Sequence, residues 1–213
     1  MKFSERKAAV VAALSPELTA RGFRYQASTD RFVRNPAADC THALHILFTE
    51  SAPFVRLDVH IAVRLDAVEK IFHRTSGYEK KYQSGTPTMG GAIDAITGNP
   101  QLRMLLEPHQ ERTQARAQLL SDTMLEFYEA WFTRFSDIAN IDHELNDDPL
   151  RDTPNRPLPW LRCSTGIIAA CMRERPDYPH LADAYVGVLR AISNGFYLPR
   201  FEMLLADLAA LKR

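Results

Sequence analysis

The sequence has no excess of either charge and no apolar run of membrane length. Lysine and arginine together number 26, and so do aspartate and glutamate. This balance gives no indication of a nucleic-acid partner. Apolar stretches such as residues 8–14 are far shorter than the roughly 20 residues that a membrane helix needs. We therefore expect neither a nucleic-acid-binding protein nor a membrane protein.

Cysteine is also scarce, and its spacing indicates no disulfide framework. The three cysteines are Cys40, Cys163 and Cys171, and none belongs to a CxxC motif. On one helix, Cys163 and Cys171 would lie about 12 Å apart, which is too far for a disulfide. Reduced thiols of this kind predict a cytoplasmic location.

Motifs that carry chemistry are absent too. The glycine-containing stretch at residues 85–91 lacks the lysine of a phosphate-binding P-loop. The acidic residues between 142 and 152 lack the spacing of a calcium loop. We predict no catalytic residue, no metal ligand and no cofactor, and the chain is more typical of a binding protein than of an enzyme.

The clearest pattern in the sequence is an alternation of apolar and polar residues between 40 and 64. Side chains along a strand point alternately to opposite faces, so the pattern predicts a hairpin with one apolar face and one polar face. The apolar set is Leu44, Ile46, Phe48, Val55, Leu57, Val59, Ile61 and Val63.

The polar face of this hairpin supplies the candidate site residues. They are His45, Arg56, Asp58 and His60, and Arg31 of a preceding strand is expected on the same face. A carboxylate beside two imidazoles could bind a metal or orient a histidine as a general base. The arginines favour instead a solvated face or a surface that binds a partner. We prefer the solvated or partner-binding face and keep the metal or general-base site as the alternative.

Helical periodicity dominates the rest of the chain. A helix is expected over residues 4–20, with a break at Pro16, and Asp66 with Glu69 resembles the capping start of another. One more short strand is expected near residues 87–93, and helices follow from Glu111. The remaining expected elements are strands at 23–28 and 30–34, the second ending at a turn at Asn35-Pro36, and helices at 160–173, 180–193 and 199–211.

Together these elements predict an α+β fold. An N-terminal helix should pack on an antiparallel sheet of about four to five strands, followed by a helical C-terminal half. We expect a single domain over residues 1–213. Four prolines between 146 and 159 mark a linker-like sub-boundary, with a sheet-containing part at 1–145 and a three-helix part at 160–213.

Several short motifs resemble those of uncharacterised bacterial α+β proteins. The opening helix leads into Leu18-Thr-Ala-Arg-Gly22-Phe23, and Arg31-Phe32-Val33-Arg34 precedes the alternating hairpin. Thr86-Pro-Thr-Met-Gly and Trp131-Phe132-x-x-Phe135 are also similar, so the resemblance covers about residues 1–145. Some members of that group look like immunity components of bacterial competition systems.

This resemblance implies a bacterial protein that binds another protein, in the manner of an immunity-type inhibitor. Because catalytic motifs are lacking and the cysteines indicate a cytoplasmic location, we expect this protein to be non-enzymatic and cytoplasmic. The resemblance carries no catalytic residue and leaves the oligomeric state open. The alternative function is that of a small hydrolase or metal-dependent enzyme that uses His45, Asp58 and His60.

Overall fold

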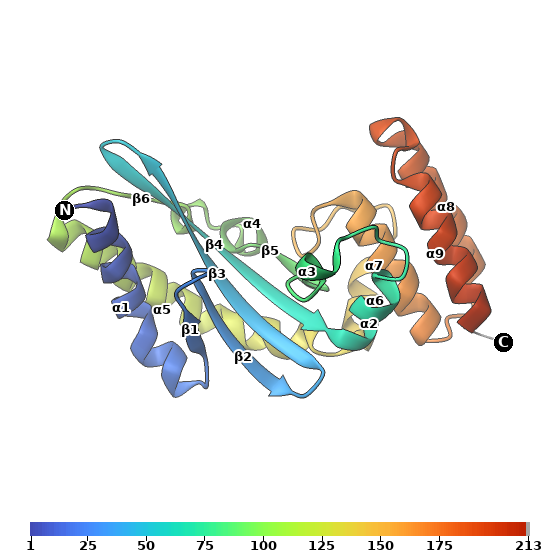
Figure 1. Ribbon diagram of the computed structural model, residues 1–213, viewed down its shortest axis with the longest axis horizontal. Coiled ribbons are helices and arrows are strands. Elements are labelled where there is room, and N and C mark those ends of the chain that lie inside the picture. The colour runs from blue at the N-terminus through green and yellow to red at the C-terminus, as the bar shows by residue number, and fades with distance from the viewer. Residues whose placement is uncertain (212–213) are drawn as a thin grey trace. The chain divides into compact units, whose positions relative to one another are not determined.

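The computed structural model describes residues 1–211, with the side chains of Leu125 and Glu126 left out. Two compact units divide the chain (Figure 1). Unit 1 contains Met1–Val63 and Gly90–Thr133, and unit 2 contains Arg64–Met89 and Arg134–Arg213. The predicted sub-boundary at 146–159 therefore falls inside unit 2. The α+β class is confirmed, with an N-terminal helix, a six-stranded sheet and a helical C-terminal half.

The sheet of unit 1 has the strand order β1-β2-β3-β4-β5, and β6 also pairs with β4. Antiparallel partners include Arg31 with His45 and Arg56 with Leu105. The long strands β3 and β4 are joined through Ala52-Pro53. The strands are β1 Arg24–Gln26, β2 Arg31–Ala37, β3 Cys40–Ser51, β4 Phe54–Leu65, β5 Met89–Ala92 and β6 Met104–Leu106.

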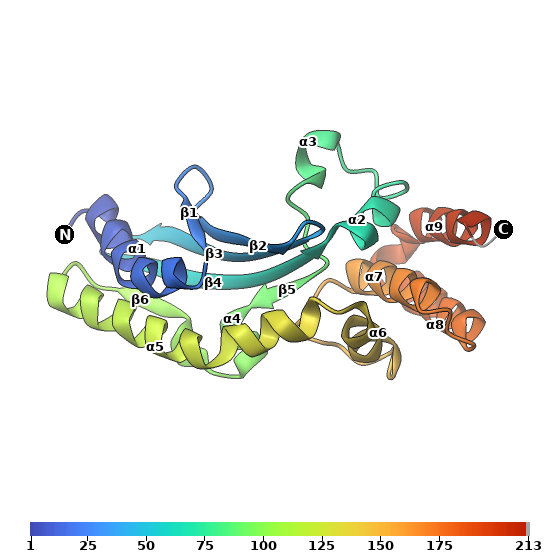
Figure 2. The same cartoon turned by 90° about the horizontal axis from the view of Figure 1, so that it is seen from below.

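The apolar alternation predicted for the hairpin is confirmed, because the odd-numbered residues of β4 from Val55 to Val63 are all buried. We call the face that they form the inner face of the sheet. Helices α1 (Phe3–Ala20) and α5 (Gln110–Phe135) cover it (Figure 2). The rings of Phe3 and Phe48 meet edge to face at 6.4 Å, and His42 stacks on Phe132 at 4.3 Å.

Two predicted chain breaks are wrong. Helix α1 continues through Pro16, and the Ser15 hydroxyl donates to the carbonyl of Val11 at 2.6 Å. Val10, Leu14 and Leu18 form one buried stripe along this helix, and packing of the whole stripe outweighs the cost of the proline.

The turn expected at Asn35-Pro36 is instead part of β2, which runs to Ala37 with a register shift after Arg34. Proline is tolerated there because an irregular strand end needs no amide donor at that position.

The strand expected near residues 87–93 is present as β5. A side chain on Gly90 would place its Cβ 2.6 Å from the carbonyl oxygen of Ile61. Glycine is therefore required at this position of β5, next to β4. The short helix α4 (Ile93–Thr97) and a 3₁₀ turn at Pro100–Leu102 then lead to β6, which the sequence patterns did not predict.

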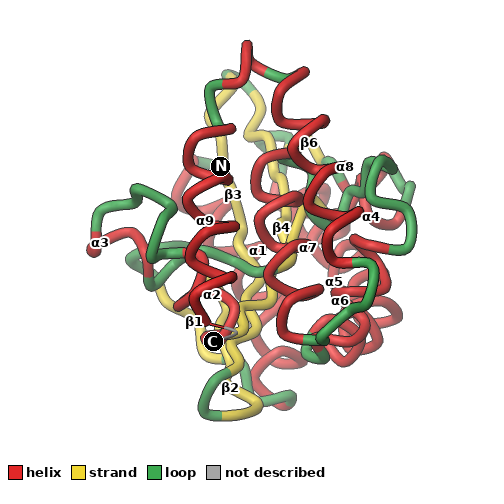
Figure 3. Tube along the Cα trace, turned by 90° about the vertical axis from the view of Figure 1, so that its right-hand side faces the viewer, coloured by secondary structure: helices red, strands yellow, loops and turns green. Residues whose placement is uncertain are grey.

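Unit 2 is mainly helical, and the three C-terminal helices were predicted to within two residues at each end. Their apolar faces meet around Ile167, Tyr185 and Leu204, which are almost completely buried. Figure 3 shows these helices in red. The helices of unit 2 are α2 Asp66–Phe72, α3 Lys80–Gln83, α6 Ile138–Asn146, α7 Pro159–Met172, α8 Tyr178–Ala191 and α9 Leu198–Leu211.

The segment between α6 and α7 is irregular, as its prolines predict, but it packs against these two helices within unit 2. The Thr153 hydroxyl donates to Glu144 at 2.5 Å, and Arg162 donates to the carbonyls of Pro149 and Arg151 at 2.6 and 3.0 Å. None of the helices in the described part of the chain is long and apolar enough to cross a membrane.

Candidate functional site

The predicted site residues lie on the sheet face of unit 1 opposite to α1 and α5, which we call the outer face. His45 of β3 is the direct partner of Arg31 in β2, and direct partners in an antiparallel pair share a face. Arg56, Asp58 and His60 alternate with the buried residues of β4 and so point the same way. The outer face carries Arg31, His45, Leu47, Phe54, Arg56, Asp58, His60, Arg103 and Leu105.

Asp58 is bound by guanidinium groups. The Nε of Arg56 donates to Asp58 Oδ2 at 2.7 Å, and the Nε of Arg103 lies 3.6 Å from Asp58 Oδ1. Arg103 also pairs with Asp94 at 3.0 Å. Among the described residues Asp58 makes no hydrogen bond to His45 or His60. The carboxylate therefore neutralises arginine instead of orienting an imidazole.

His45 is half-buried in a cationic environment. Burial, together with the neighbouring Arg31 and His60, lowers the pKa of His45 to about 4. Its imidazole is therefore neutral near pH 7. The guanidinium of Arg31 donates to Thr29 and Gln26 at 3.0 and 3.1 Å, which fixes its charge beside this histidine.

Large apolar side chains are exposed where the outer face nears the β3–β4 turn. Leu47, Phe54 and Leu105 are 43%, 38% and 53% exposed. Leu105 lies directly opposite Arg56, so apolar and cationic groups are interleaved here. Arginine and aromatic residues are enriched in protein–protein interfaces, and this mixture is typical of one.

Metal chemistry has no support in this geometry. No group of three histidine, cysteine, aspartate or glutamate side chains that could hold a metal ion occurs in the described part of the chain. The two guanidinium groups beside Asp58 would also repel a cation.

Arg103 and Leu105 belong to the outer face but were not found from the sequence. Arg103 lies directly before β6, and Leu105 lies within it. This strand has only three residues, which are too few to show an alternation of apolar and polar side chains. The apolar run Met104-Leu-Leu106 was the available signal, and its pairing with β4 could not be inferred from it.

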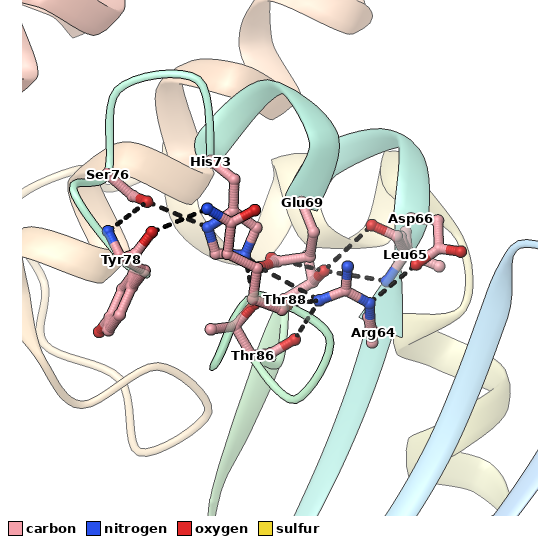
Figure 4. Close-up of polar contacts among 10 residues, drawn as sticks. Arg64, Leu65, Asp66, Glu69, His73, Ser76, Tyr78, Thr86 and Thr88 are labelled. Carbon is pink, nitrogen blue, oxygen red and sulfur yellow. Dashed lines mark hydrogen bonds and ion pairs between the residues drawn. The ribbon is translucent and has the colours of Figure 1, made fainter. Parts of the chain in front are cut away.

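A second polar cluster lies in unit 2, around a buried carboxylate that was also missed. Glu69 is fully buried, and it accepts hydrogen bonds from the hydroxyls of Thr86 and Thr88 at 2.6 and 3.0 Å (Figure 4). Burial raises the pKa of Glu69, while the charge of Arg156 and these hydroxyls oppose the rise. The capping role expected for Glu69 is wrong, since its side chain turns into the protein.

His73 extends this cluster along α2. Its Nδ1 lies 3.0 Å from the Ser76 hydroxyl and its Nε2 lies 2.7 Å from the Thr86 hydroxyl. Because Thr86 donates its proton to Glu69, it accepts one from Nε2, and Ser76 donates to Nδ1. Burial lowers the pKa of His73, with help from Arg64, and favours this neutral form. The cluster thus joins α2 to the segment that follows it.

Comparison with known proteins gave no relative: no family model, no curated protein and no solved structure matches the chain.

Proposed function

We propose that this chain is a non-enzymatic, cytoplasmic bacterial protein that binds a partner protein, in the manner of an immunity protein that inhibits a toxin. The outer face of unit 1 is the binding surface in this proposal. The observation that carries it is the exposure of Leu47, Phe54 and Leu105 beside Arg56. Apolar side chains gathered on one face of a sheet whose other face is already covered favour burial against a second protein.

The charges on this face favour an acidic partner. Arg31, Arg56 and Arg103 outnumber the two carboxylates, Asp58 and Asp94, and both carboxylates are already paired with arginine. A partner that places carboxylates around an apolar centre would complement this arrangement.

The strand edges favour binding through the face over binding by strand addition. The edge of β4 is occupied by both β5 and β6, which have four and three residues. At the other side of the sheet β1 has three residues. Such short edge strands offer few free backbone groups to an added strand.

Co-expression with the product of the neighbouring gene tests the proposal. If that product is a toxin, the wild-type protein should restore growth and co-purify with it. Leu105→Arg and Phe54→Ala should weaken binding by roughly 30-fold, the effect of losing a central interface residue. Met203→Arg changes an exposed apolar residue of unit 2 and is the matched control, expected to bind normally.

Two outcomes would oppose the proposal. Outer-face variants that bind as well as Met203→Arg would exclude this surface. Stoichiometric zinc or manganese in the purified protein, lost in His60→Ala, would favour the hydrolase alternative with His45, Asp58 and His60.

A further inference from the structure

A basic pocket of about 310 Å³ opens to solvent beside α2 in unit 2. Its lining includes three side chains that are cationic at neutral pH and no acidic side chain. The lining residues are Arg64, Lys70, His73, Arg74, Gln83 and Ser84.

The guanidinium of Arg64 is held rigidly at this pocket. Its Nε donates to Asp66 at 2.8 Å, and its Nη1 donates to the carbonyls of Gln83 and Thr86 at 2.8 and 2.9 Å. The remaining nitrogen, Nη2, donates to no other side chain or carbonyl in the described part of the chain. Figure 4 shows this nitrogen turned away from Thr86, on the side of α2. Two N–H groups of a fixed guanidinium are thus left for a ligand.

Two further cations come from α2 and the turn that follows it. Lys70 is exposed and forms no ion pair with any of the described residues. Arg74 pairs with Asp207 at 3.0 Å through one nitrogen and is 47% exposed. The helix dipole explains why Lys70 and Arg74 are favourable near the C-terminal end of α2. It does not explain Arg64, which lines the same pocket but belongs to β4. Cations from β4 and from the end of α2 therefore line one pocket, together with the neutral ring of His73.

We infer that this pocket binds a phosphate group, either as inorganic phosphate or as the terminal group of a small phosphomonoester. The free Nη2 of a fixed guanidinium can donate to phosphate oxygen, and a lysine adds a mobile positive charge. The pocket is open to solvent, so the organic part of an ester can extend outward. This site lies in unit 2 and does not depend on the function proposed for the outer face of unit 1.

Calorimetric titration of the full-length protein at constant ionic strength tests the inference. The probes are inorganic phosphate and glycerol phosphate, and we expect saturable one-site binding in the millimolar range or tighter. Lys70→Gln should weaken it about tenfold, since it removes one charged contact. Lys2→Gln removes the same charge from an exposed position in unit 1 and should bind as wild type.

The two probes also distinguish the source of the phosphate. Tighter binding of glycerol phosphate would assign an ester, whereas equal or weaker binding would assign inorganic phosphate. Absence of saturable binding for both probes would overturn the inference. Equal affinities for wild type and a Lys70→Gln variant with unchanged melting temperature would do the same.

Discussion

Acid should destabilise unit 1 through His42, which is almost completely buried between the sheet and α5. The ring stacks on Phe132, and its Nδ1 accepts a hydrogen bond from the Nε of Arg34 at 3.1 Å. Burial and, to a smaller extent, the adjacent Arg34 lower the pKa of His42 from 6.5 to about 4, against a smaller opposing effect of Glu129. The native protein therefore keeps this imidazole neutral.

The direction of the pH effect follows from this shift. Well above pH 6.5 the imidazole is neutral in both states and has no effect on the free energy of unfolding. As the pH falls from 6.5 towards 4, the unfolded chain binds a proton that the native chain does not, and stability is lost. At about pH 5 the loss amounts to about 2 kcal/mol, and it approaches about 3 kcal/mol at lower pH.

Urea unfolding of wild type and His42→Phe at several pH values measures this loss. The variant changes the absolute stability, but its pH dependence should be flatter by about 2 kcal/mol between about pH 7.5 and about pH 5. His109→Gln, at an exposed position, is the control and should follow wild type. Parallel stability curves for wild type and His42→Phe would refute the reasoning.

Three further results are expected. Leu57→Asp places an unpaired carboxylate in the fully buried inner face and should abolish cooperative thermal unfolding of unit 1, whereas a wild-type melting curve would contradict the assigned face. Glu69→Ala removes the acceptor of the Thr86 and Thr88 hydroxyls and a charge that stabilises the buried guanidinium of Arg156, so it should cost about 3 kcal/mol in urea unfolding, and a loss below about 1 kcal/mol would show that these groups are satisfied elsewhere. Burial raises the pKa of Cys163 to about 12, so a thiol reagent at about pH 8 should label the half-buried Cys171 first, and rapid labelling of Cys163 in the native protein would contradict its burial.

The β3–β4 hairpin could be predicted because one face is buried and the other is not. A period of two then appears directly in the sequence, and it placed Asp58 and His60 on the correct side of the sheet. The pairing of Asp58 with Arg103 could not be predicted, because it depends on how a distant three-residue strand docks on β4. Contacts of this kind do not appear in the periodicity of apolar and polar residues along the sequence.

Glu69 shows a different limit of sequence patterns. Asp66 and Glu69 have the spacing of a capping start, and α2 does begin at Asp66. The side chain of Glu69 nevertheless binds Thr86 and Thr88, which follow 17 and 19 residues later. A buried glutamate and a capping glutamate have the same spacing in the sequence. Only the position of the segment that carries Thr86 and Thr88 distinguishes them.

The chain passes between the two units three times, after Val63, after Met89 and after Thr133. During synthesis, the whole first segment of unit 2 is made before α5. The inner face of the sheet therefore lacks this covering helix until that segment is complete. That segment already contains Glu69 and both of its hydroxyl partners, so this hydrogen-bonded cluster can form early. Arg156 is made later than this segment, and its buried guanidinium then adds a second positive charge to that of Arg64, which lies 3.7 Å from the carboxylate. Neither unit can be released by a single cut, and shortening the chain from its C-terminus removes parts of unit 2 before it removes any part of unit 1.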